Sequence, residues 1–590
     1  MPTAEETEIP LSLYLWRRIR QLGTQSIMGV PGDMNLELLD YLDEVDGLSW
    51  VGNANELNAA YAADGYARVK GSPGVVVTTM GVGELSALNG VAGAYTEQVK
   101  LIHIVGTTPT HVQAKRLMIH HSLGPNPDHK VYEKISSHVR CAHAWLEDQM
   151  TATAEVDRVI RECMVNSLPV YIFVPMDFVH VPVASSPLRT PIDFILPVDE
   201  EQEAIAVSET IAAIRSAKCP VLLVDCLTDR HNAVEEAQAL AEIVQFPIFS
   251  TSMGKTIIGE THPRYYGIYN GTVSYPGVKS LVEESDCILN LGPLLADSNT
   301  GGHTRDIRSD QVIMVESSSC SVFGARYEGV YLKPFLRKLL AELKGCEMPT
   351  VTLPVLPAQP EPSDSDSKDI VQSWIWKRLG NFTRAGDVLV AESGTAQFGF
   401  PDAEFPTGAK YLTQVYYGSI GYSVGACLGV AIAQKELELE TGRRGRTILV
   451  VGDGSLQLTV QEIGSMIRLG LNPLLIVINN NGYTIERAIH GPQAGYNDIA
   501  SWKHQQLLGF FGAESAAESS RQVRTKEEME AVLVAEAYQS PTSIQLLEVH
   551  MDVMDIPWRL RDQIAIINAR SKTTKGGTGL ANGTKASNGF

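Results

Sequence analysis

Short apolar runs alternate along most of the chain with stretches whose apolar residues recur at helical spacing. Such runs, when they lie between turn residues, are typical of buried strands in parallel sheets. Strands are expected at residues 75–77, 101–105, 170–174, 221–224, 448–451 and 474–478. Because strands and helices alternate, the pattern predicts an α/β fold class with doubly wound parallel sheets.

Two proline-rich stretches interrupt this alternation, and we interpret them as linkers. Residues 183–200 contain three prolines, and residues 351–368 contain four prolines followed by alternating serine and aspartate. Proline is common in linkers because it ends helices and cannot pair within a central strand. The C-terminal residues are mainly small or polar and have little to bury, which predicts disorder. We predict a first domain at residues 1–190, a central domain at residues 191–360, a third domain at residues 361–570 and a disordered tail at residues 571–590.

Composition narrows the classes of function. A chain of 590 residues is too long for one hydrophobic core. Its formal net charge of −20 disfavours nucleic acid and anionic membranes as partners, because both repel an acidic surface. No apolar stretch reaches the roughly 20 residues that a membrane helix needs, and the acidic N-terminus does not resemble a secretory signal. Eight cysteines without a C-x-x-C pair indicate reduced thiols, so a cytoplasmic location is expected.

In the third domain, two predicted strands flank a predicted helix, and each strand is followed by a polar loop that contains glycine. The loops are residues 452–455 and 479–482, and a helix is predicted between them over residues 459–469. Both loops follow the carboxyl ends of parallel strands, where open α/β sheets bind their ligands. Each Asp-Gly or Asn-Gly pair alone is also a common tight turn. Together, with Asp453 and Asn480 separated by 27 positions, they resemble the thiamine diphosphate signature, which runs from G-D-G to N-N.

The residues of these two loops suit a magnesium ion and a diphosphate. Asp453 offers a carboxylate oxygen, Asn480 an amide oxygen and Gly482 its backbone carbonyl. Mg²⁺ prefers such hard oxygen ligands and usually completes its shell with phosphate oxygens and water. Gly454 lets the backbone approach a phosphate closely, and Ser455 adds a hydroxyl donor. We therefore predict Asp453, Asn480 and Gly482 as the metal ligands.

Candidate proton-handling residues lie in the first domain. Glu56 is a lone acid among small and apolar neighbours, and a buried carboxyl of this kind could activate a thiamine cofactor. His120 and His121 are adjacent imidazoles, which suit proton transfer near neutral pH. Asp33 follows a Gly/Pro turn that would expose its carboxyl. Taken singly, these residues also have ordinary explanations. Glu56 is then a charge on a helix surface, the two histidines are a solvated pair, and Asp33 is a turn residue.

Together these motifs resemble the pyruvate decarboxylase family, in particular its fungal type, over about residues 8–565. The matching stretches are residues 29–33, 53–58, 81–90, 120–121, 391–395, 417–421, 452–459 and 480–486. The resemblance implies three α/β domains: pyrimidine-binding, central without cofactor, and diphosphate-binding. It implies thiamine diphosphate and Mg²⁺ as cofactors, held between the first domain of one subunit and the third domain of its partner. A homodimer would then be the minimal active unit, and a homotetramer is usual in the family.

The resemblance also assigns roles by position. Glu56 becomes the cofactor-activating acid, and Asp33, His120, His121 and Glu486 become the proton-handling set. The cofactor-binding positions are Glu56, Thr395, Gly418, Ser419, Ile420, Asp453, Gly454, Ser455, Asn480, Asn481, Gly482, Tyr483, Thr484 and Ile485.

The implied activity is the non-oxidative decarboxylation of a 2-oxo acid to an aldehyde and CO₂, in the first place of pyruvate to acetaldehyde. The alternative is a decarboxylase of larger 2-oxo acids, such as phenylpyruvate, indolepyruvate and branched or longer aliphatic acids. Ser298 and Ser393 stand where the yeast-type enzymes carry phenylalanine and threonine, so the pocket is expected to be roomier. A carboligase would lack the histidine pair, and a silent scaffold would have lost Glu56, Asp453 or a histidine.

Overall fold

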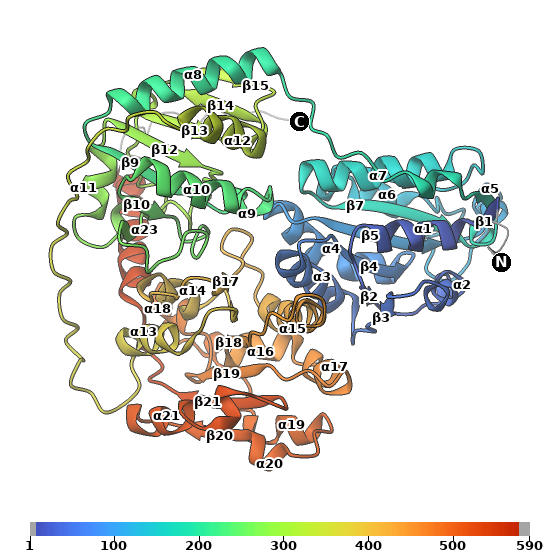
Figure 1. Cartoon of the computed structure of the whole chain (residues 1–590). Helices are drawn as coiled ribbons and strands as arrows, with labels where there is room; N and C mark the ends of the chain where they lie inside the picture. The colour runs from blue at the N-terminus through green and yellow to red at the C-terminus, as the bar shows by residue number, and fades with distance from the viewer. Residues whose placement is uncertain (1–6, 577–590) are drawn as a thin grey trace, which may run out of the picture.

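The computed structural model describes residues 7–576, and its three large sheets lie in three separate lobes of the molecule (Figure 1). The α/β fold class predicted from the sequence is confirmed. No helix within the described range is both long and apolar enough to cross a membrane.

The first sheet has six parallel strands in the order β3-β2-β4-β5-β7-β6. Its strands are β2 (Ser26–Gly29), β3 (Ser49–Trp50), β4 (Gly74–Thr79), β5 (Leu101–Thr107), β6 (Ala142–Trp145) and β7 (Val170–Pro175). Helices α1 (Leu11–Gln21) and α7 (Ala152–Asn166) share one core with the sheet, and α3 (Glu56–Lys70) and α4 (Val82–Thr96) share another. Because helices cover both faces, β4, β5 and β7 are buried throughout, which explains their continuous apolar runs.

The central sheet has seven strands in the order β11-β10-β9-β12-β13-β14-β15. They are β9 (Pro220–Val224), β10 (Ile248–Ser250), β11 (Tyr265–Ile268), β12 (Cys287–Leu291), β13 (Val312–Val315), β14 (Ser319–Val322) and β15 (Ala325–Glu328). Helices α8 (Glu200–Ser216), α10 (Val234–Val244) and α12 (Leu332–Leu343) pack on it. The last two strands are antiparallel, unlike the parallel sheet expected, because the three residues between β13 and β14 are too few for a parallel crossover.

The third sheet has six parallel strands in the order β17-β16-β18-β19-β21-β20. They are β16 (Val388–Ala391), β17 (Lys410–Leu412), β18 (Thr447–Gly452), β19 (Leu474–Asn479), β20 (Ser520–Val523) and β21 (Gln545–His550). Its main helices are α13 (Gln372–Phe382), α14 (Thr395–Gly399), α15 (Tyr422–Thr441), α16 (Asp453–Thr459), α17 (Glu462–Arg468), α18 (Thr484–Ile489), α21 (Lys526–Leu533) and α23 (Trp558–Gly576).

Two local expectations in this domain differ from the structure. The single helix expected over residues 459–469 is two helices, because α16 begins directly after β18 and ends before α17 starts. Asp453 is the first residue of α16, and an acidic side chain in the first turn of a helix interacts favourably with the helix dipole. Helix α23 continues past Arg570 to Gly576, because extending an existing helix costs little. The rest of the predicted disordered tail, residues 577–590, lies outside the described residues.

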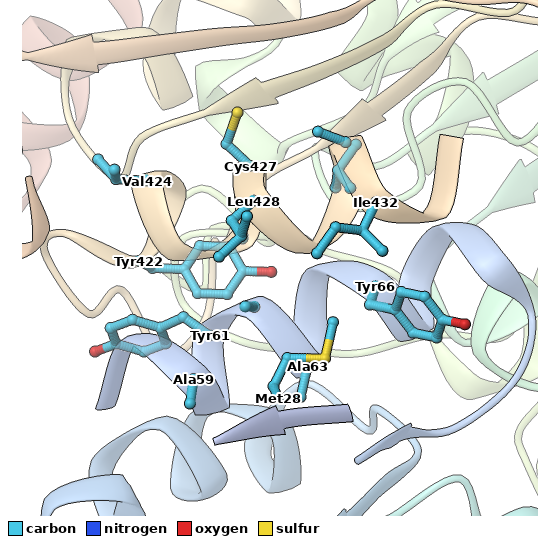
Figure 2. Packing of buried hydrophobic residues seen from close by; sticks show 14 of the residues in the cluster. Met28, Ala59, Tyr61, Ala63, Tyr66, Tyr422, Val424, Cys427, Leu428 and Ile432 are labelled. Atoms are coloured by element: carbon cyan, nitrogen blue, oxygen red, sulfur yellow. The ribbon is translucent and has the colours of Figure 1, made fainter. Parts of the chain in front are cut away.

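Helices α3 and α15 join the first domain to the third (Figure 2). They approach so closely that a Cβ atom on Gly429 would lie 1.8 Å from the backbone oxygen of Ala62. A Cβ atom on Gly65 would lie 2.3 Å from the backbone oxygen of Ala426. Only glycine fits at these contacts, so the small residues near Glu56 fix its helix against the third domain.

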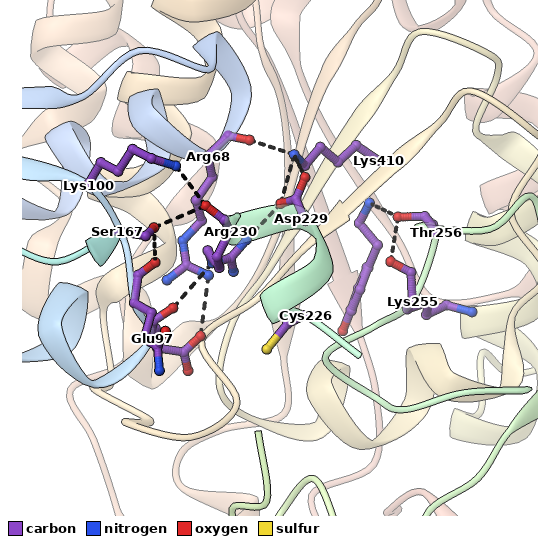
Figure 3. Close-up of polar contacts among 12 residues, drawn as sticks. Arg68, Glu97, Lys100, Ser167, Cys226, Asp229, Arg230, Lys255, Thr256 and Lys410 are labelled. Carbon is purple, nitrogen blue, oxygen red and sulfur yellow. Dashed lines mark hydrogen bonds and ion pairs between the residues drawn. The ribbon is translucent and has the colours of Figure 1, made fainter. Parts of the chain in front are cut away.

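Polar contacts join all three domains at a second place (Figure 3). Lys410 of the third domain donates to the backbone oxygen of Arg68 in the first (2.5 Å) and to Asp229 Oδ1 in the central domain (3.1 Å). Lys100 of the first domain donates to the backbone oxygen of Arg230 in the central domain (2.6 Å). The relative placement of the domains is thus fixed by charged groups as well as by apolar packing.

Candidate active site

A cavity of about 360 Å³ opens where the carboxyl ends of β16, β18 and β19 meet. This is the edge at which parallel α/β sheets bind ligands. Most of the site residues predicted for the third domain line it. They are Thr395, Ile420, Asp453, Gly454, Ser455, Asn480, Gly482, Tyr483, Thr484, Ile485 and Glu486. Glu392 and Ser393 line it as well.

Three oxygen atoms of the predicted metal ligands converge beside this cavity. The side-chain oxygen of Asn480 lies 3.2 Å from Asp453 Oδ1 and 3.1 Å from the backbone oxygen of Gly482. With the amide reversed, its nitrogen would donate to both oxygens, and its oxygen would accept from Thr484 Oγ1 at 2.8 Å. Asp453 and Asn480 are 3% and 5% exposed, so water does not reach these contacts, and the reversed amide satisfies them without a cation.

A cation held by all three oxygens would instead favour the orientation in which the Asn480 oxygen faces the other two. In an octahedral Mg²⁺ site with bonds of about 2.05 Å, neighbouring oxygens lie about 2.9 Å apart, close to the observed spacings. Burial raises the pKa of the Asp453 carboxyl, although the backbone N–H groups of Gly454 and Gly482 offset part of this effect. A bound divalent cation would favour the ionised form further. The donor set therefore fits Mg²⁺.

The backbone around the metal ligands depends on two glycines. Gly482 has φ +119°, which side-chain-bearing residues rarely adopt, and a Cβ there would lie 2.5 Å from the backbone oxygen of Asn497. This conformation sets the direction of its carbonyl. A Cβ on Gly454 would lie 2.6 Å from the ring of Tyr483. Gly454 therefore makes room for that ring, a role that the sequence did not indicate.

The loop before α15 forms another wall of the cavity. Ile420 lines the cavity, whereas Gly418 and Ser419 do not, and neither does Asn481. Gly418 has φ +61°, and the hydroxyls of Ser419 and Tyr61 lie 2.5 Å apart in a hydrogen bond to the first domain. These two loop residues hold the turn that presents Ile420.

The structure brings Asp33, His120 and His121 together, whereas Glu486, the fourth residue of the proposed proton-handling set, lines the cavity of the third domain. Asp33 Oδ2 and His120 Nε2 are 2.5 Å apart, and the two imidazole ring centres are separated by 4.7 Å. His121 has φ +66°, and Tyr132 donates a hydrogen bond to its backbone oxygen (2.5 Å). Asp33 and His120 are exposed, so this cluster can exchange protons with solvent or with a bound molecule.

Glu56 is the first residue of α3, and its neighbours hold that end of the helix. Asn55 caps the helix by accepting the backbone N–H of Asn58 (2.8 Å). Glu462 of α17 accepts the backbone N–H of Ala54 (2.9 Å) and the side-chain amide of Asn58 (3.0 Å). The half-buried Glu56 side chain lies beside Gly83, where a Cβ would be 3.1 Å from its Oε1 atom.

The predicted site therefore falls into two groups within one chain. The metal and diphosphate positions line the cavity of the third domain. None of Glu56, Asp33, His120 and His121, all in the first domain, is among the described residues that line it. The structure of one chain therefore does not bring the two groups into one cavity.

Sequence reasoning missed one of the three acidic residues that line the cavity. Glu392 directly follows β16, is 1% exposed, and accepts hydrogen bonds from loops on two sides of the cavity. Burial raises the pKa of its carboxyl, and the donors around it lower it in part. The available signal was an acid at the carboxyl end of a buried strand, within a stretch that matched the family.

Three protein-family models match the chain. They are the "Thiamine pyrophosphate enzyme" N-terminal TPP binding domain at residues 11–131, the central domain at residues 207–343 and the C-terminal TPP binding domain at residues 393–546. Among solved structures, a Rhodococcus jostii thiamine diphosphate-dependent 4-hydroxybenzoylformate decarboxylase matches with a TM-score of 0.72 and 17% identity. The match covers 92% of this chain and 99% of that one, and it supports the fold alone.

Curated fungal proteins match over nearly the full length. A Kluyveromyces lactis protein named "Pyruvate decarboxylase" is 44% identical over 95% of this chain and 99% of its own. "Pyruvate decarboxylase isozyme 1" of Saccharomyces cerevisiae is 43% identical over the same shares. "Pyruvate decarboxylase" of Aspergillus fumigatus is 42% identical over 96% of this chain and 98% of its own.

Proposed function

Because this chain belongs to the pyruvate decarboxylase family of thiamine pyrophosphate enzymes, we propose that it converts pyruvate to acetaldehyde and CO₂. Within the structure, the observation that carries this proposal is the convergence of the Asp453 carboxylate, the Asn480 side-chain amide and the Gly482 carbonyl oxygen beside the cavity. Those oxygens would hold Mg²⁺, and the metal would hold the diphosphate of the cofactor. When bound, thiamine diphosphate supplies a nucleophilic carbon and an electron sink for the departing carboxylate.

The remaining roles belong to the chain's own side chains. Glu56 would hold a proton at a ring nitrogen of the aminopyrimidine, as the family position implies. Asp33, His120, His121 and Glu486 would deliver or accept the protons that the release of an aldehyde requires. Their exposure fits proton exchange, because an exposed imidazole or carboxyl reaches water directly.

The active unit proposed is a homodimer, within a homotetramer of the kind usual in the family. Asp33, His120, His121 and Glu56 do not line the cavity of their own chain, whereas Glu486 does. Two chains related by a twofold axis would give each cavity a first domain from the partner subunit. Two equivalent sites per dimer follow from this symmetry.

The second candidate function is decarboxylation of larger 2-oxo acids. Its support is Ser393, which lines the cavity with a small side chain and donates to the backbone oxygen of Gln414 (2.8 Å). Ser298 does not line the cavity of its own chain. Each extra methylene of a substrate that the cavity buries contributes about 0.8 kcal/mol, or roughly fourfold in binding. The space in the cavity therefore decides between 2-oxo acids that differ by one methylene.

A substrate panel tests these proposals with the purified protein, Mg²⁺ and thiamine diphosphate. The panel contains pyruvate, 2-oxobutanoate, 2-oxopentanoate and phenylpyruvate, and kcat/KM is measured for each. We expect acetaldehyde from pyruvate, comparable rates for the two aliphatic homologues, and a range narrowed toward pyruvate in Ser298→Phe. A kcat/KM for phenylpyruvate far above that for pyruvate would favour the second candidate. Identical ratios in Ser298→Phe would show that this residue does not face the substrate.

Asp453→Ala removes a proposed metal ligand, so gel-filtered protein should lose both Mg²⁺ and thiamine diphosphate. The matched control is Asp310→Ala, because that aspartate is largely exposed on the central domain. Retention of the cofactor by Asp453→Ala at the level of the control would contradict the metal assignment.

A further inference from the structure

Glu392 is a buried acid in the cavity wall to which no function has been assigned so far. It follows β16 directly and lies between the turn at residues 393–395 and the loop at residues 418–423. Its side chain is almost fully buried, and among the side chains that the structure describes no basic group forms an ion pair with it. An unpaired buried carboxylate is costly unless hydrogen-bond donors satisfy it.

The donors to Glu392 come from both cofactor-facing segments. Oε1 accepts the backbone N–H of Ser393 (3.0 Å) and that of Gly421 (3.2 Å). Oε2 accepts the hydroxyl of Ser423 (2.5 Å) and its backbone N–H (3.3 Å). One carboxylate therefore ties the turn after β16 to the loop before α15. A carboxylate suits this place because both of its oxygens accept.

The opposite side of the same loop is also held. Thr459 at the end of α16 donates its hydroxyl to the backbone oxygen of Gly421 (2.6 Å). The N–H of Gly421 is bound by Glu392 and its carbonyl by Thr459, so both polar groups of this residue are fixed. The residue directly before it is Ile420, whose side chain lines the cavity. The direction of Ile420 thus depends on Glu392.

We propose that Glu392 is a positioning residue, which sets Thr395 and Ile420 in register on two sides of the cofactor cavity. The inference rests on the proposed function, because it assumes that the cavity holds thiamine diphosphate. Glu392 acts through the two loops and not on the reacting atoms. Its effect should appear in cofactor affinity and in the activation of bound cofactor, and not in folding alone.

The direct test replaces Glu392 by glutamine. An amide offers one acceptor oxygen, so its nitrogen would face either the N–H of Gly421 or that of Ser423, and one loop would shift. Aspartate keeps both oxygens but is shorter by one methylene, so it should not reach both loops. Ser423→Ala removes only the hydroxyl and leaves the backbone donors in place. It serves as the milder variant if Glu392→Gln does not fold.

The matched control is Glu436→Gln. Glu436 is also buried, accepts the hydroxyls of Ser26 (2.6 Å) and Tyr66 (2.7 Å), and lies on α15 outside the cavity lining. The measurements are the Kd for thiamine diphosphate with Mg²⁺, the C2–H exchange rate of saturated protein, and the thermal unfolding midpoint.

We expect Glu392→Gln to weaken cofactor binding and slow the exchange about tenfold, the equivalent of one strong hydrogen bond. Ser423→Ala should weaken binding about threefold, and Glu436→Gln should leave Kd and exchange unchanged. Wild-type Kd and exchange in Glu392→Gln, or equal losses in Glu436→Gln, would overturn the inference. If Glu392→Gln does not fold, unchanged values in Ser423→Ala would overturn it. A wild-type protein that binds no thiamine diphosphate would instead refute the proposed function.

Discussion

At the scale of single residues, the environment decides what each acid can do. Asp453, Glu392, Glu84 and Glu56 all carry carboxyl groups, yet Asp453 accepts two backbone N–H groups beside the Asn480 amide, whereas Glu392 accepts four hydrogen bonds. Glu84 is 3% exposed and accepts only the backbone N–H of Gly81 (2.8 Å). Glu56 is half-buried at a helix start. These surroundings distinguish a proposed metal ligand, a proposed positioning residue, a buried helix cap and a proposed cofactor-activating acid.

Glu56→Gln keeps the shape of the side chain and removes its acid. Cofactor binding should persist, while C2–H exchange of the bound cofactor should slow by about 10²–10⁴, the usual contribution of a positioned acid or base. Exchange can be followed by proton NMR after quenching in acid. The control is Glu37→Gln, because Glu37 is exposed on the first domain. Exchange in Glu56→Gln at the rate of that control would exclude Glu56 as the activating acid.

Glu84 should make stability depend on pH. Burial raises the pKa of its carboxyl to about 8, and the N–H of Gly81 and the charge of Arg140 offset part of the effect. The unfolded chain releases this proton near pH 4.3, so the folded protein binds more protons between these values. Stability is therefore lost as pH rises from about 4.3 through 8. Urea unfolding at pH 6 and pH 9 should show this loss in the wild type and less of it in Glu84→Gln. If the free energy of unfolding depends on pH identically in the two proteins, the raised pKa of the Glu84 carboxyl is contradicted.

Among single residues, the sequence allowed a prediction for those whose partners come from a neighbouring strand. Asp453 and Asn480 each follow a buried strand, and the strands are neighbours, so their meeting could be predicted. Glu392 also follows a strand, but three of its four hydrogen bonds come from a loop about thirty residues farther along the chain. Neither composition nor spacing indicates which N–H groups will face a buried acid. That information exists only in the packed structure.

At the scale of elements, strands were more predictable than helix ends. The cores of β4, β5, β7, β9, β18 and β19 coincide with the expected apolar runs. The start of α16 at Asp453 differs from the prediction because Asp453 and Gly454 are residue types that are common in loops. The pairing of α3 with α15 was not predicted, since glycine and alanine patterns indicate a close contact but do not identify the partner helix.

Because α3 and α15 are in close contact, we expect one added methyl group between them to lower the stability of the protein. Gly429→Ala should place a Cβ against the backbone oxygen of Ala62, so the helices must separate, at a cost of about 1–3 kcal/mol. The higher helix propensity of alanine offsets about 1 kcal/mol of this. Thermal unfolding should begin at a lower temperature than in the wild type. Gly509→Ala is the control, because its Cβ would meet Ala516 at an ordinary 3.4 Å. Equal midpoints for the two variants would show that the helices can separate without cost.

At the scale of the whole molecule, the main feature is the division of the site. The cavity belongs to the third domain, and the cluster of Asp33 and the two histidines belongs to the first. The contacts of α3 with α15 and of Lys410 with Asp229 join the domains of one chain without bringing these groups into one cavity. The sequence implied a shared site only through its family resemblance, because spacing along one chain carries no information about a second chain.

Complementation between two inactive variants tests the shared site most directly. Glu56→Gln and Asp453→Ala chains with different affinity tags are co-expressed, and mixed dimers are isolated by both tags. If each site combines Glu56 of one chain with Asp453 of its partner, one site of a mixed dimer carries both changes and the other carries neither. Pyruvate decarboxylation should then return to about half of the wild-type rate per dimer. A rate no higher than that of either variant alone would contradict a site shared between two chains.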